Sequence, residues 1–168
     1  MLSYLFSKLK KSIKCARACA IINGTYLPTK KRNVVLKKAG IIFEGASIIM
    51  PPFFFEFGKI TLKNNVYINS GCTFLDNANI SIGENSLIGP NVTLSTPGHP
   101  TDPITRNTEV EARAIFIGSN VWLGAGVVVL PGITIGDNSV IAANSVVTSD
   151  VPADCLYAGA PAVFKRKI

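Results

Sequence analysis

The feature of this sequence that most constrains its fold is a period of six residues. Over residues 117–147 an aliphatic side chain occupies every sixth position, and a small residue directly follows four of these. The aliphatic residues are Ile117, Leu123, Val129, Ile135, Ile141 and Val147, and the small residues are Gly118, Gly124, Gly136 and Ala142. Because side chains repeat every 3.6 residues in an α-helix and every two residues in a strand, neither element alone gives this spacing.

A coil of short strands does give a period of six. The same pattern occurs upstream, with one shift of two residues, at Leu62, Ile68, Phe74, Ile82, Ile88 and Leu94. In each hexad we expect positions one and five to point inward and the small residue at position two to permit a sharp corner. Three hexads then close one triangular turn, and successive turns stack their aliphatic residues. The sequence therefore predicts an all-β fold, a parallel β-helix with a continuous axial core.

One long interruption separates Leu94 from Ile117. The interval of 23 residues is not a multiple of six, and residues 96–114 within it contain three prolines, five charged residues and the single histidine of the chain, His99. This composition does not fit an apolar coil, so we expect a loop that protrudes from the solenoid. Loops held on a rigid scaffold often carry functional residues.

The N-terminal segment carries the positive charge of the chain. Residues 1–38 contain ten Lys or Arg and no Asp or Glu, whereas the remaining 130 residues contain seven basic and ten acidic residues. Apolar residues with the spacing of an amphipathic helix lie among these lysines, at Leu2, Leu5, Phe6, Leu9 and Ile13. We interpret residues 1–38 as a basic, partly helical arm and residues 39–168 as the β-helix domain, which ends in a tail over residues 154–168.

Three interpretations of the arm stay open. It can pack over the open end of the solenoid, bind the surface of an anionic membrane, or contact nucleic acid. No nucleic-acid-binding motif accompanies it, which argues against the third interpretation. Packing is the safest of the three, because a solenoid needs a cap at its open end.

Composition and residue spacing exclude several classes of protein. No apolar run approaches the length of about 20 residues that a membrane-spanning helix needs, and lysines interrupt the N-terminus where a signal peptide would be apolar. The four cysteines, at positions 15, 19, 72 and 155, form no C-x-x-C pair, and a single histidine cannot supply a zinc-finger site. We therefore expect reduced thiols, a buried and inert Cys72, and a cytoplasmic protein.

Several longer motifs carry a resemblance to a known family. They read ISIGENSLIGPNVTL, GHP, IFIGSNVWLGAGVVVLPGITIGDNSVIAANSVVTSDVP and AGAPA. Over residues 48–162 the chain resembles the hexapeptide-repeat acetyltransferases, especially the maltose and galactoside O-acetyltransferases and the polysaccharide O-acetyltransferases. The resemblance implies a left-handed β-helix, a homotrimer with active sites between subunits, and acetyl-CoA as the acyl donor without a metal.

His99 occupies the Gly-His-Pro position where this family keeps its catalytic histidine. Transfer of an acetyl group to a hydroxyl requires a base near neutral pH, and histidine titrates in that range. The resemblance therefore implies that His99 is the general base. The alternative is a surface histidine that makes a structural hydrogen bond.

Four residues match positions near the acceptor pocket of the family, namely Asn69, Asp76, Asn77 and Glu56. Carboxylates and amides can bind sugar hydroxyls through directional hydrogen bonds. The alternative for Asn69, Asp76 and Asn77 is a role in the corners of the coil, since Asn and Asp are common turn residues. The alternative for Glu56 is a solvated charge.

The resemblance also implies a binding site for acetyl-CoA. Trp122 corresponds to a wall of the active-site tunnel, and the backbone N–H groups of Gly124 and Ala125 correspond to the contacts with the donor and the oxyanion. The groove for CoA corresponds to Ala142, Ala143 and Thr148.

Two residues differ from the family pattern at positions expected to face the phosphates of CoA. Ser149 and Val163 stand where the family commonly has Lys and Arg. Lys165, Arg166 and Lys167 can replace those cations, or they can form a solvated basic terminus.

Together these features predict an acetyl-CoA-dependent O-acetyltransferase that acts directly, without an acyl-enzyme. Its acceptor is expected to be a sugar hydroxyl of a bacterial surface polysaccharide or its precursor, and its location the cytoplasm or the inner face of the membrane. Two alternatives stay open: acetylation of an amino sugar or a xenobiotic, and a catalytically silent β-helix that serves in binding or assembly.

Overall fold

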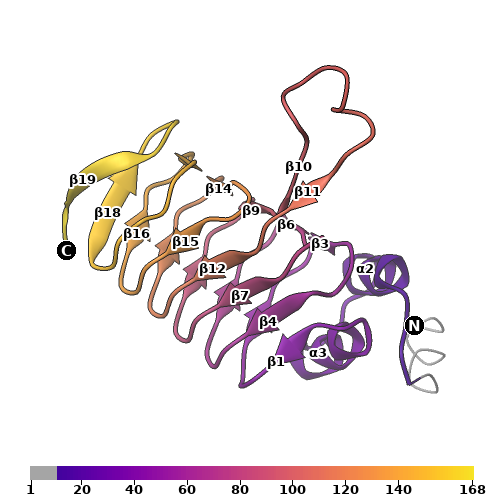
Figure 1. Cartoon of the computed structure of the whole chain (residues 1–168). Coiled ribbons are helices and arrows are strands. Elements are labelled where there is room, and N and C mark those ends of the chain that lie inside the picture. Colours follow the sequence, from indigo (N-terminus) through magenta and orange to yellow (C-terminus); the bar gives the residue numbers. More distant parts are fainter. Residues whose placement is uncertain (1–10) are drawn as a thin grey trace.

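A computed structural model describes residues 11–168 of the chain. Two helices, α2 (Cys15–Gly24) and α3 (Thr29–Lys38), precede a solenoid of short strands that winds toward the C-terminus (Figure 1). Within residues 11–168, neither helix has the length and apolar character that crossing a membrane requires.

Three parallel sheets form the sides of the solenoid. The first sheet consists of β1 (Ile42–Phe43), β4 (Ile60–Leu62), β7 (Ile80–Ile82), β12 (Ile115–Ile117) and β15 (Thr134–Ile135). The second sheet consists of β2 (Ile48–Ile49), β5 (Tyr67–Ile68), β8 (Leu87–Ile88), β13 (Trp122–Leu123), β16 (Val140–Ile141), β18 (Cys155–Ala158) and β19 (Val163–Lys167), the last of which is antiparallel. The third sheet consists of β3 (Phe53–Phe55), β6 (Cys72–Leu75), β9 (Thr93–Ser95), β14 (Val128–Val129) and β17 (Val146–Val147).

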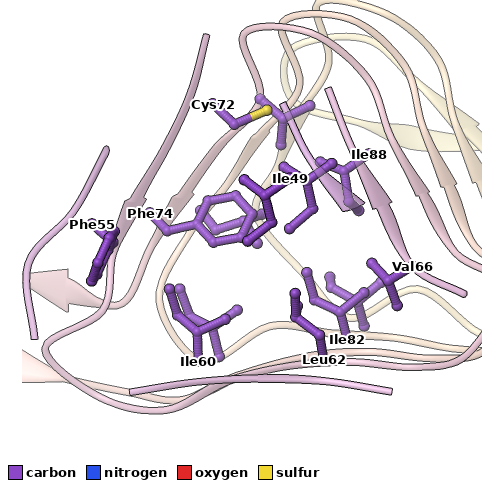
Figure 2. Close-up of a cluster of buried hydrophobic side chains, with 14 of the residues drawn as sticks. Ile49, Phe55, Ile60, Leu62, Val66, Cys72, Phe74, Ile82 and Ile88 are labelled. Carbon is purple, nitrogen blue, oxygen red and sulfur yellow. The ribbon is translucent and has the colours of Figure 1, made fainter. Parts of the chain in front are cut away.

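The repeating aliphatic residues fill the axis of the solenoid, as the sequence predicts. Every residue of position one, from Leu62 to Val147, is at most 3% exposed. Figure 2 shows how side chains such as Phe74, Ile82 and Ile88 point toward one another from the three sides. Burial of one such side chain stabilises the fold by about 1.5–3 kcal/mol, so the axial stack is the main source of stability.

Position five also points inward, and three of its residues are serines, Ser86, Ser139 and Ser145. Ser139 and Ser145 are fully buried, yet each hydroxyl has a partner. The Ser139 hydroxyl donates to the Pro152 carbonyl at 2.7 Å, and the Ser145 hydroxyl accepts from the Gly159 N–H at 3.0 Å. These hydrogen bonds tie successive turns together inside the core and remove the cost of burying a hydroxyl.

The small residues at position two do not make the sharp corners of the coil, contrary to what the sequence predicts. The sharp bend between the first and second sheets is made by asparagines with positive φ, such as Asn120 at 55° and Asn138 at 59°. The glycine at position two is needed for a different reason, because a Cβ on Gly118 would lie 2.8 Å from the Asp137 N atom of the next turn. Glycine thus permits the close stacking of turns, while asparagine tolerates the left-handed backbone.

The same asparagines form a side-chain ladder along this corner. Asn120 Nδ2 donates to Asn138 Oδ1 at 3.0 Å, and Asn138 Nδ2 donates to Asp154 Oδ1 at 2.8 Å. Two turns earlier, Asn65 donates to Asn85 in the same way. Asn65, Asn120 and Asn138 therefore both bend the chain and bind the corner residue of the next turn.

Helices α2 and α3 close the N-terminal end of the solenoid (Figure 1). The Asn23 side chain pairs with the edge strand β3, since its Nδ2 donates to the Phe53 carbonyl at 3.0 Å and its Oδ1 accepts from the Phe53 N–H at 2.9 Å. Asn33 of α3 donates to the Ser47 carbonyl at 2.8 Å. Most of the predicted helix from Leu2 to Ile13 lies outside the described residues, and Ile13 itself is not helical.

The predicted tail over residues 154–168 is more regular than expected. Residues 155–158 form β18 in the last turn of the coil, and residues 163–167 turn back as β19 beside it. Tyr157 and Phe164 meet edge to face, with ring centroids 6.0 Å apart. The C-terminus therefore ends the solenoid with an antiparallel strand rather than with a free tail.

Candidate active site

The interruption of the repeat is a loop that rises from the solenoid on a short two-stranded ribbon (Figure 1). The ribbon consists of β10 (Pro97–Gly98) and β11 (Glu111–Ala112), and His99 directly follows β10. At the base of the loop, the Arg113 N–H donates to the Thr96 carbonyl at 2.9 Å. The loop is thus anchored to the coil on both sides, which places His99 on an ordered support.

The hydrogen bond of the His99 ring determines which of its two nitrogens can accept a proton. Its Nδ1 lies 2.9 Å from the carbonyl oxygen of Arg106, across the loop. A carbonyl oxygen only accepts hydrogen bonds, so Nδ1 must carry the proton and donate. In the neutral ring Nε2 then carries the lone pair. The side chain is exposed, so Nε2 can accept a proton from an incoming group.

Arg106 holds the loop in the shape that this contact needs. Its guanidinium donates to the Thr101 carbonyl at 2.6 Å, and its backbone N–H donates to the Asp102 carbonyl at 3.0 Å. The Asp102 carboxylate accepts from the Ile104 N–H at 2.9 Å and closes a turn between them. Arg106 cannot be predicted from the sequence, because its role depends on a contact across the loop.

A second cluster lies at the corner between the second and third sheets, which we call the Gly124 corner. It stacks residues of successive turns, and the backbone ladder there runs through Asn69, Gly89, Gly124 and Ala142. A Cβ on Gly124 would lie 2.6 Å from the Ala143 N atom, so the turns approach as closely as glycine allows. The structure therefore brings together Asn69, Gly124, Ala125, Ala142 and Ala143 in one corner.

The backbone N–H groups of this corner differ in their availability. The Gly124 N–H donates to the Ile141 carbonyl at 2.8 Å as part of the ladder, so it cannot stabilise an oxyanion. The Gly124 N–H is therefore occupied within the coil, while a contact of Gly124 with acetyl-CoA stays a prediction. The Ala125 N–H makes no hydrogen bond within the described part of the chain, and Ala125 is exposed. Ala125 thus offers a donor to a ligand, whereas Gly124 shapes the backbone.

Trp122 stands on the outer face of the second sheet, directly before this corner. The side chain is 55% exposed, and the strand register places it between Leu87 and Val140. Tyr67 and Ile48 continue the same row toward the N-terminus. Trp122 therefore lies in a row of outward apolar side chains, of which only the tryptophan is recognisable from the sequence motifs.

A third cluster lies at the corner between the third and first sheets, which we call the loop corner because the His99 loop leaves from it. Of the predicted site residues, this corner holds Glu56, Asp76, Asn77, Thr148 and Ser149. Thr148 and Ser149 are exposed. The width of the third sheet separates them from Ala142 and Ala143, so the predicted CoA groove is not continuous on one face of the chain.

Asp76 is fully buried at the loop corner. Its Oδ1 accepts from the N–H groups of Glu56 and Phe57 at 2.7 and 3.0 Å, and its Oδ2 accepts from the Lys59 N–H at 2.7 Å. A buried carboxylate with three backbone partners holds the corner and has no exposed oxygen for a sugar. The structure thus favours the corner role for Asp76 over contact with the acceptor.

The other predicted acceptor residues keep free polar groups. Asn69 is half-buried, and its Oδ1 accepts from the Ser70 N–H at 2.8 Å, which leaves its amide hydrogens to donate. Glu56 is exposed. Asn77 has a buried Oδ1 without a hydrogen-bond partner in the described chain, while its carbonyl accepts from Lys59 Nζ at 2.5 Å.

The basic C-terminal residues belong to the second sheet. Arg166 is in register with Leu156, which pairs with Val140 and through it with Trp122. Three strand spacings of about 4.8 Å place Arg166 about 14 Å from Trp122 along the sheet. Lys165 and Lys167 are exposed on the same strand.

Three of the four cysteines, Cys15, Cys19 and Cys72, offer no nucleophile at these clusters. Cys72 is 1% exposed, and burial raises the pKa of its thiol to about 11. Burial likewise raises the pKa of Cys15 and of Cys19. A thiol with such a pKa stays protonated at neutral pH and does not attack a thioester. Within residues 11–168, no three metal-ligating side chains gather into a metal site.

Comparison with known proteins supplies the family. Residues 114–149 match the model of the bacterial transferase hexapeptide (six repeats), and residues 79–98 match that of the hexapeptide repeat of succinyl-transferase. The galactoside O-acetyltransferase of Escherichia coli (strain K12) is 42% identical over 141 residues, which cover 83% of this chain and 70% of that protein. The chain belongs to the hexapeptide-repeat acetyltransferases.

Solved structures of this family share the fold. A galactoside acetyltransferase in complex with coenzyme A superposes with a TM-score of 0.86 at 37% identity, over 99% of this chain and 81% of that one. The hexapeptide-repeat acetyltransferase VCA0836 of Vibrio cholerae, complexed with acetyl coenzyme A, gives a TM-score of 0.87 at 38% identity, over 91% and 84%. The predicted left-handed parallel β-helix and the predicted acyltransferase class are thereby confirmed, and acetyl-CoA as co-substrate agrees with these complexes.

Proposed function

We propose that this acetyltransferase moves the acetyl group of acetyl-CoA to a sugar hydroxyl, with His99 as the general base. The observation that carries the proposal is the contact between His99 Nδ1 and the Arg106 carbonyl. This hydrogen bond fixes the tautomer of His99 in which Nε2 is basic. The loop that carries both residues is anchored to the coil. The relatives named galactoside O-acetyltransferase support a hydroxyl acceptor on a sugar.

The reaction is a direct transfer. His99 Nε2 takes the proton of the acceptor hydroxyl as its oxygen attacks the thioester carbonyl, and the resulting oxyanion accepts a hydrogen bond from the Ala125 N–H. Collapse of the tetrahedral intermediate breaks the C–S bond, and the imidazolium returns the proton to the thiolate of CoA. The products are an acetyl ester and free CoA. The protonated thiol of Cys72 is consistent with a reaction that has no acyl-enzyme.

We infer that the active site is shared between subunits of a homotrimer. In one chain the third sheet separates the loop corner from the Gly124 corner, and within residues 11–168 the one hydrogen bond of the His99 side chain lies in its own loop. A neighbouring copy can bring its Gly124 corner to the His99 loop. The apolar side chain of Ile104 on the loop, which is 84% exposed, supports such a contact.

Light scattering tests the assembly. Three chains of 17.9 kDa give a trimer of 53.7 kDa. A stable monomer at micromolar concentration that retains full activity would contradict a shared site.

The substrate contacts follow from the free polar groups. Asn69 and Glu56 offer an amide donor and a carboxylate to the acceptor, and Asn77 lies beside Glu56 at the loop corner. Arg166 and Lys165 on β19 supply positive charge for the phosphates of CoA in place of the family cations missing at Ser149 and Val163. We place the acceptor in a bacterial surface polysaccharide or its precursor.

The basic N-terminal segment would bring the enzyme to an anionic membrane at the cytoplasmic face, where lipid-linked precursors are found. Residues 11–38 alone contain eight Lys or Arg and no acidic residue, and Lys11, Lys14 and Arg17 are exposed. Each basic residue near the surface contributes about 1 kcal/mol, and salt screens the attraction over about 8 Å. Sedimentation with vesicles that contain acidic lipid tests this role, and absence of binding at low salt would leave the segment as a packing element.

A thiol-release assay tests the reaction itself. The enzyme is incubated with acetyl-CoA and a panel of neutral sugars, acidic oligosaccharides, amino sugars and drug alcohols. We expect CoA release with sugars that have hydroxyls but no amine. A strict requirement for an amine would replace O-acetylation by N-acetylation, and no release with any acceptor would favour a binding or assembly module.

A further inference from the structure

A groove of about 570 Å³ lies between α3 and the N-terminal turn of the solenoid, away from the Gly124 corner and the loop corner. The helix contributes Thr29, Lys30, Asn33 and Lys37, of which the last three are three, four or seven residues apart and therefore share one face. The first strand of the second sheet contributes Ile48. A volume of this size is typical of sites that bind small molecules or parts of larger ones.

The lining of the groove combines apolar side chains, among them Val34 and Ile48, with positive charge. Lys30 and Lys37 are the charged residues of the lining, and no acidic side chain accompanies them. Seven residues along a helix correspond to about 10 Å, so the two ammonium groups can meet two separate negative charges. Lys30 has no ion-pair partner among residues 11–168, and Lys37 Nζ lies 5.7 Å from the centre of the Phe43 ring. Both cations are therefore available to an anionic ligand.

The amide of Asn33 ties α3 to the first turn of the coil at this groove. Its Nδ2 donates to the Ser47 carbonyl at 2.8 Å, and its Oδ1 is buried, so a ligand in the groove does not reach that oxygen. Thr29 offers a hydroxyl at the end of the groove. Hydroxyl groups together with spaced negative charges are the chemistry of an acidic sugar chain.

The groove leads toward the proposed active site. Ile48 is in register with Tyr67, Tyr67 with Leu87, and Leu87 with Trp122. Three strand spacings of about 4.8 Å give about 14 Å from Ile48 to Trp122 along the outer face of the second sheet. A single sugar ring does not span this distance, whereas an oligosaccharide does.

We propose that the groove is an acceptor subsite for an anionic oligosaccharide or polysaccharide. Lys30 and Lys37 bind acidic groups of the sugar chain, and the chain follows the outer face of the second sheet to the hydroxyl that is acetylated near Trp122. This inference rests on the proposed function and narrows its substrate class from sugars in general to acidic sugar chains.

The test compares two variants with the same loss of charge. Lys30→Gln/Lys37→Gln removes both cations of the groove, and Lys14→Gln/Arg17→Gln removes two exposed cations from a different part of the N-terminal end. Calorimetry measures binding of hexagalacturonate, which is acidic, and of maltohexaose, which is neutral. Thiol release then gives KM for each acceptor and for acetyl-CoA.

We expect the groove variant to bind hexagalacturonate about tenfold more weakly than wild type, as the loss of two exposed ion pairs implies. Its affinity for maltohexaose and its KM for acetyl-CoA should not change, and the control variant should bind hexagalacturonate as wild type does. An equal loss of affinity for hexagalacturonate in both variants would show that binding depends only on general electrostatic attraction. That result would overturn the proposal.

Three further outcomes distinguish this inference from the proposed function and from binding of lipid. Acetylation of neutral sugars by an enzyme that does not bind hexagalacturonate would overturn the groove alone. Binding of hexagalacturonate that depends on Lys30 and Lys37, without thiol release by any sugar, would support the groove and contradict the proposed reaction. Binding of anionic vesicles through these lysines, without binding of hexagalacturonate, would assign the groove to lipid.

Discussion

Substitution of His99 by alanine tests the proposed base most directly. The change removes the group that takes the acceptor proton, and general base catalysis contributes about 10²–10⁴ to a rate. We therefore expect kcat to fall by that factor, which corresponds to about 3–5 kcal/mol of barrier, while KM for acetyl-CoA stays within a few-fold. The bound donor contacts the Gly124 corner rather than the His99 ring in the proposed site.

The same substitution should leave the fold intact. His99 is exposed, and its side-chain contact is with Arg106 of the same loop, outside the axial core. Exposed residues away from special contacts change the free energy of unfolding by about 0.5 kcal/mol or less. The melting temperature should therefore differ from that of wild type by about 2 °C or less.

A control in the same loop makes the comparison specific. Thr108 is exposed, and its hydroxyl donates to the Thr105 carbonyl at 3.1 Å without contact to His99. Thr108→Ala should keep kcat within about twofold of wild type. Turnover, donor KM, melting temperature and molar mass are measured on one preparation of each variant. A folded His99→Ala enzyme that retains more than about a tenth of wild-type turnover would refute the general-base mechanism.

Three other predictions concern the core and the corners. Asp76→Ala leaves three backbone N–H groups without their acceptor and should lower the free energy of unfolding by at least about 3 kcal/mol. Asp76→Asn should cost less, because its amide oxygen still accepts a hydrogen bond. Equal denaturation midpoints for the two variants would contradict the corner role. Phe74→Ala empties a site at the axis that is 0% exposed and should cost about 3–5 kcal/mol in chemical denaturation. Cys72, whose pKa burial raises to about 11, should resist alkylation at pH 8 in the folded enzyme and react after unfolding, and its contribution to stability should hold below pH 9 and fall as the pH rises toward 11.

The period of six determines most of the architecture. A residue such as Leu123 occurs where every turn needs an inward aliphatic side chain, so its burial follows from spacing alone. The helices follow less readily. In α2 the buried face consists of Ala18, Cys19, Ile21 and Ile22, and Gly24 ends the helix. This spacing is typical of a helix, but the apolar and lysine pattern of residues 2–13 is the stronger helical signal in the sequence.

The candidate site is harder to predict because it depends on register between turns. The role of Gly118 in close stacking, and that of Asp76 beneath three backbone N–H groups, appear only when residues about 18 to 20 apart are superposed. The sequence likewise does not reveal that the ladder occupies the Gly124 N–H while that of Ala125 stays free. Motifs identify which residues gather, but backbone hydrogen bonds decide which of their atoms can react.

The pairing of Asn23 with β3 has a consequence for how long such a coil can grow. The edge strand of any stacked sheet has unpaired N–H and C=O groups. A strand of another chain can form hydrogen bonds with them, which is the first step toward a fibre. By donating to and accepting from Phe53, the amide of Asn23 imitates the backbone of one more strand without providing an edge for the next. A side chain thus ends the third sheet where a further turn would otherwise extend it, and it helps to keep the enzyme a particle of finite size rather than a filament.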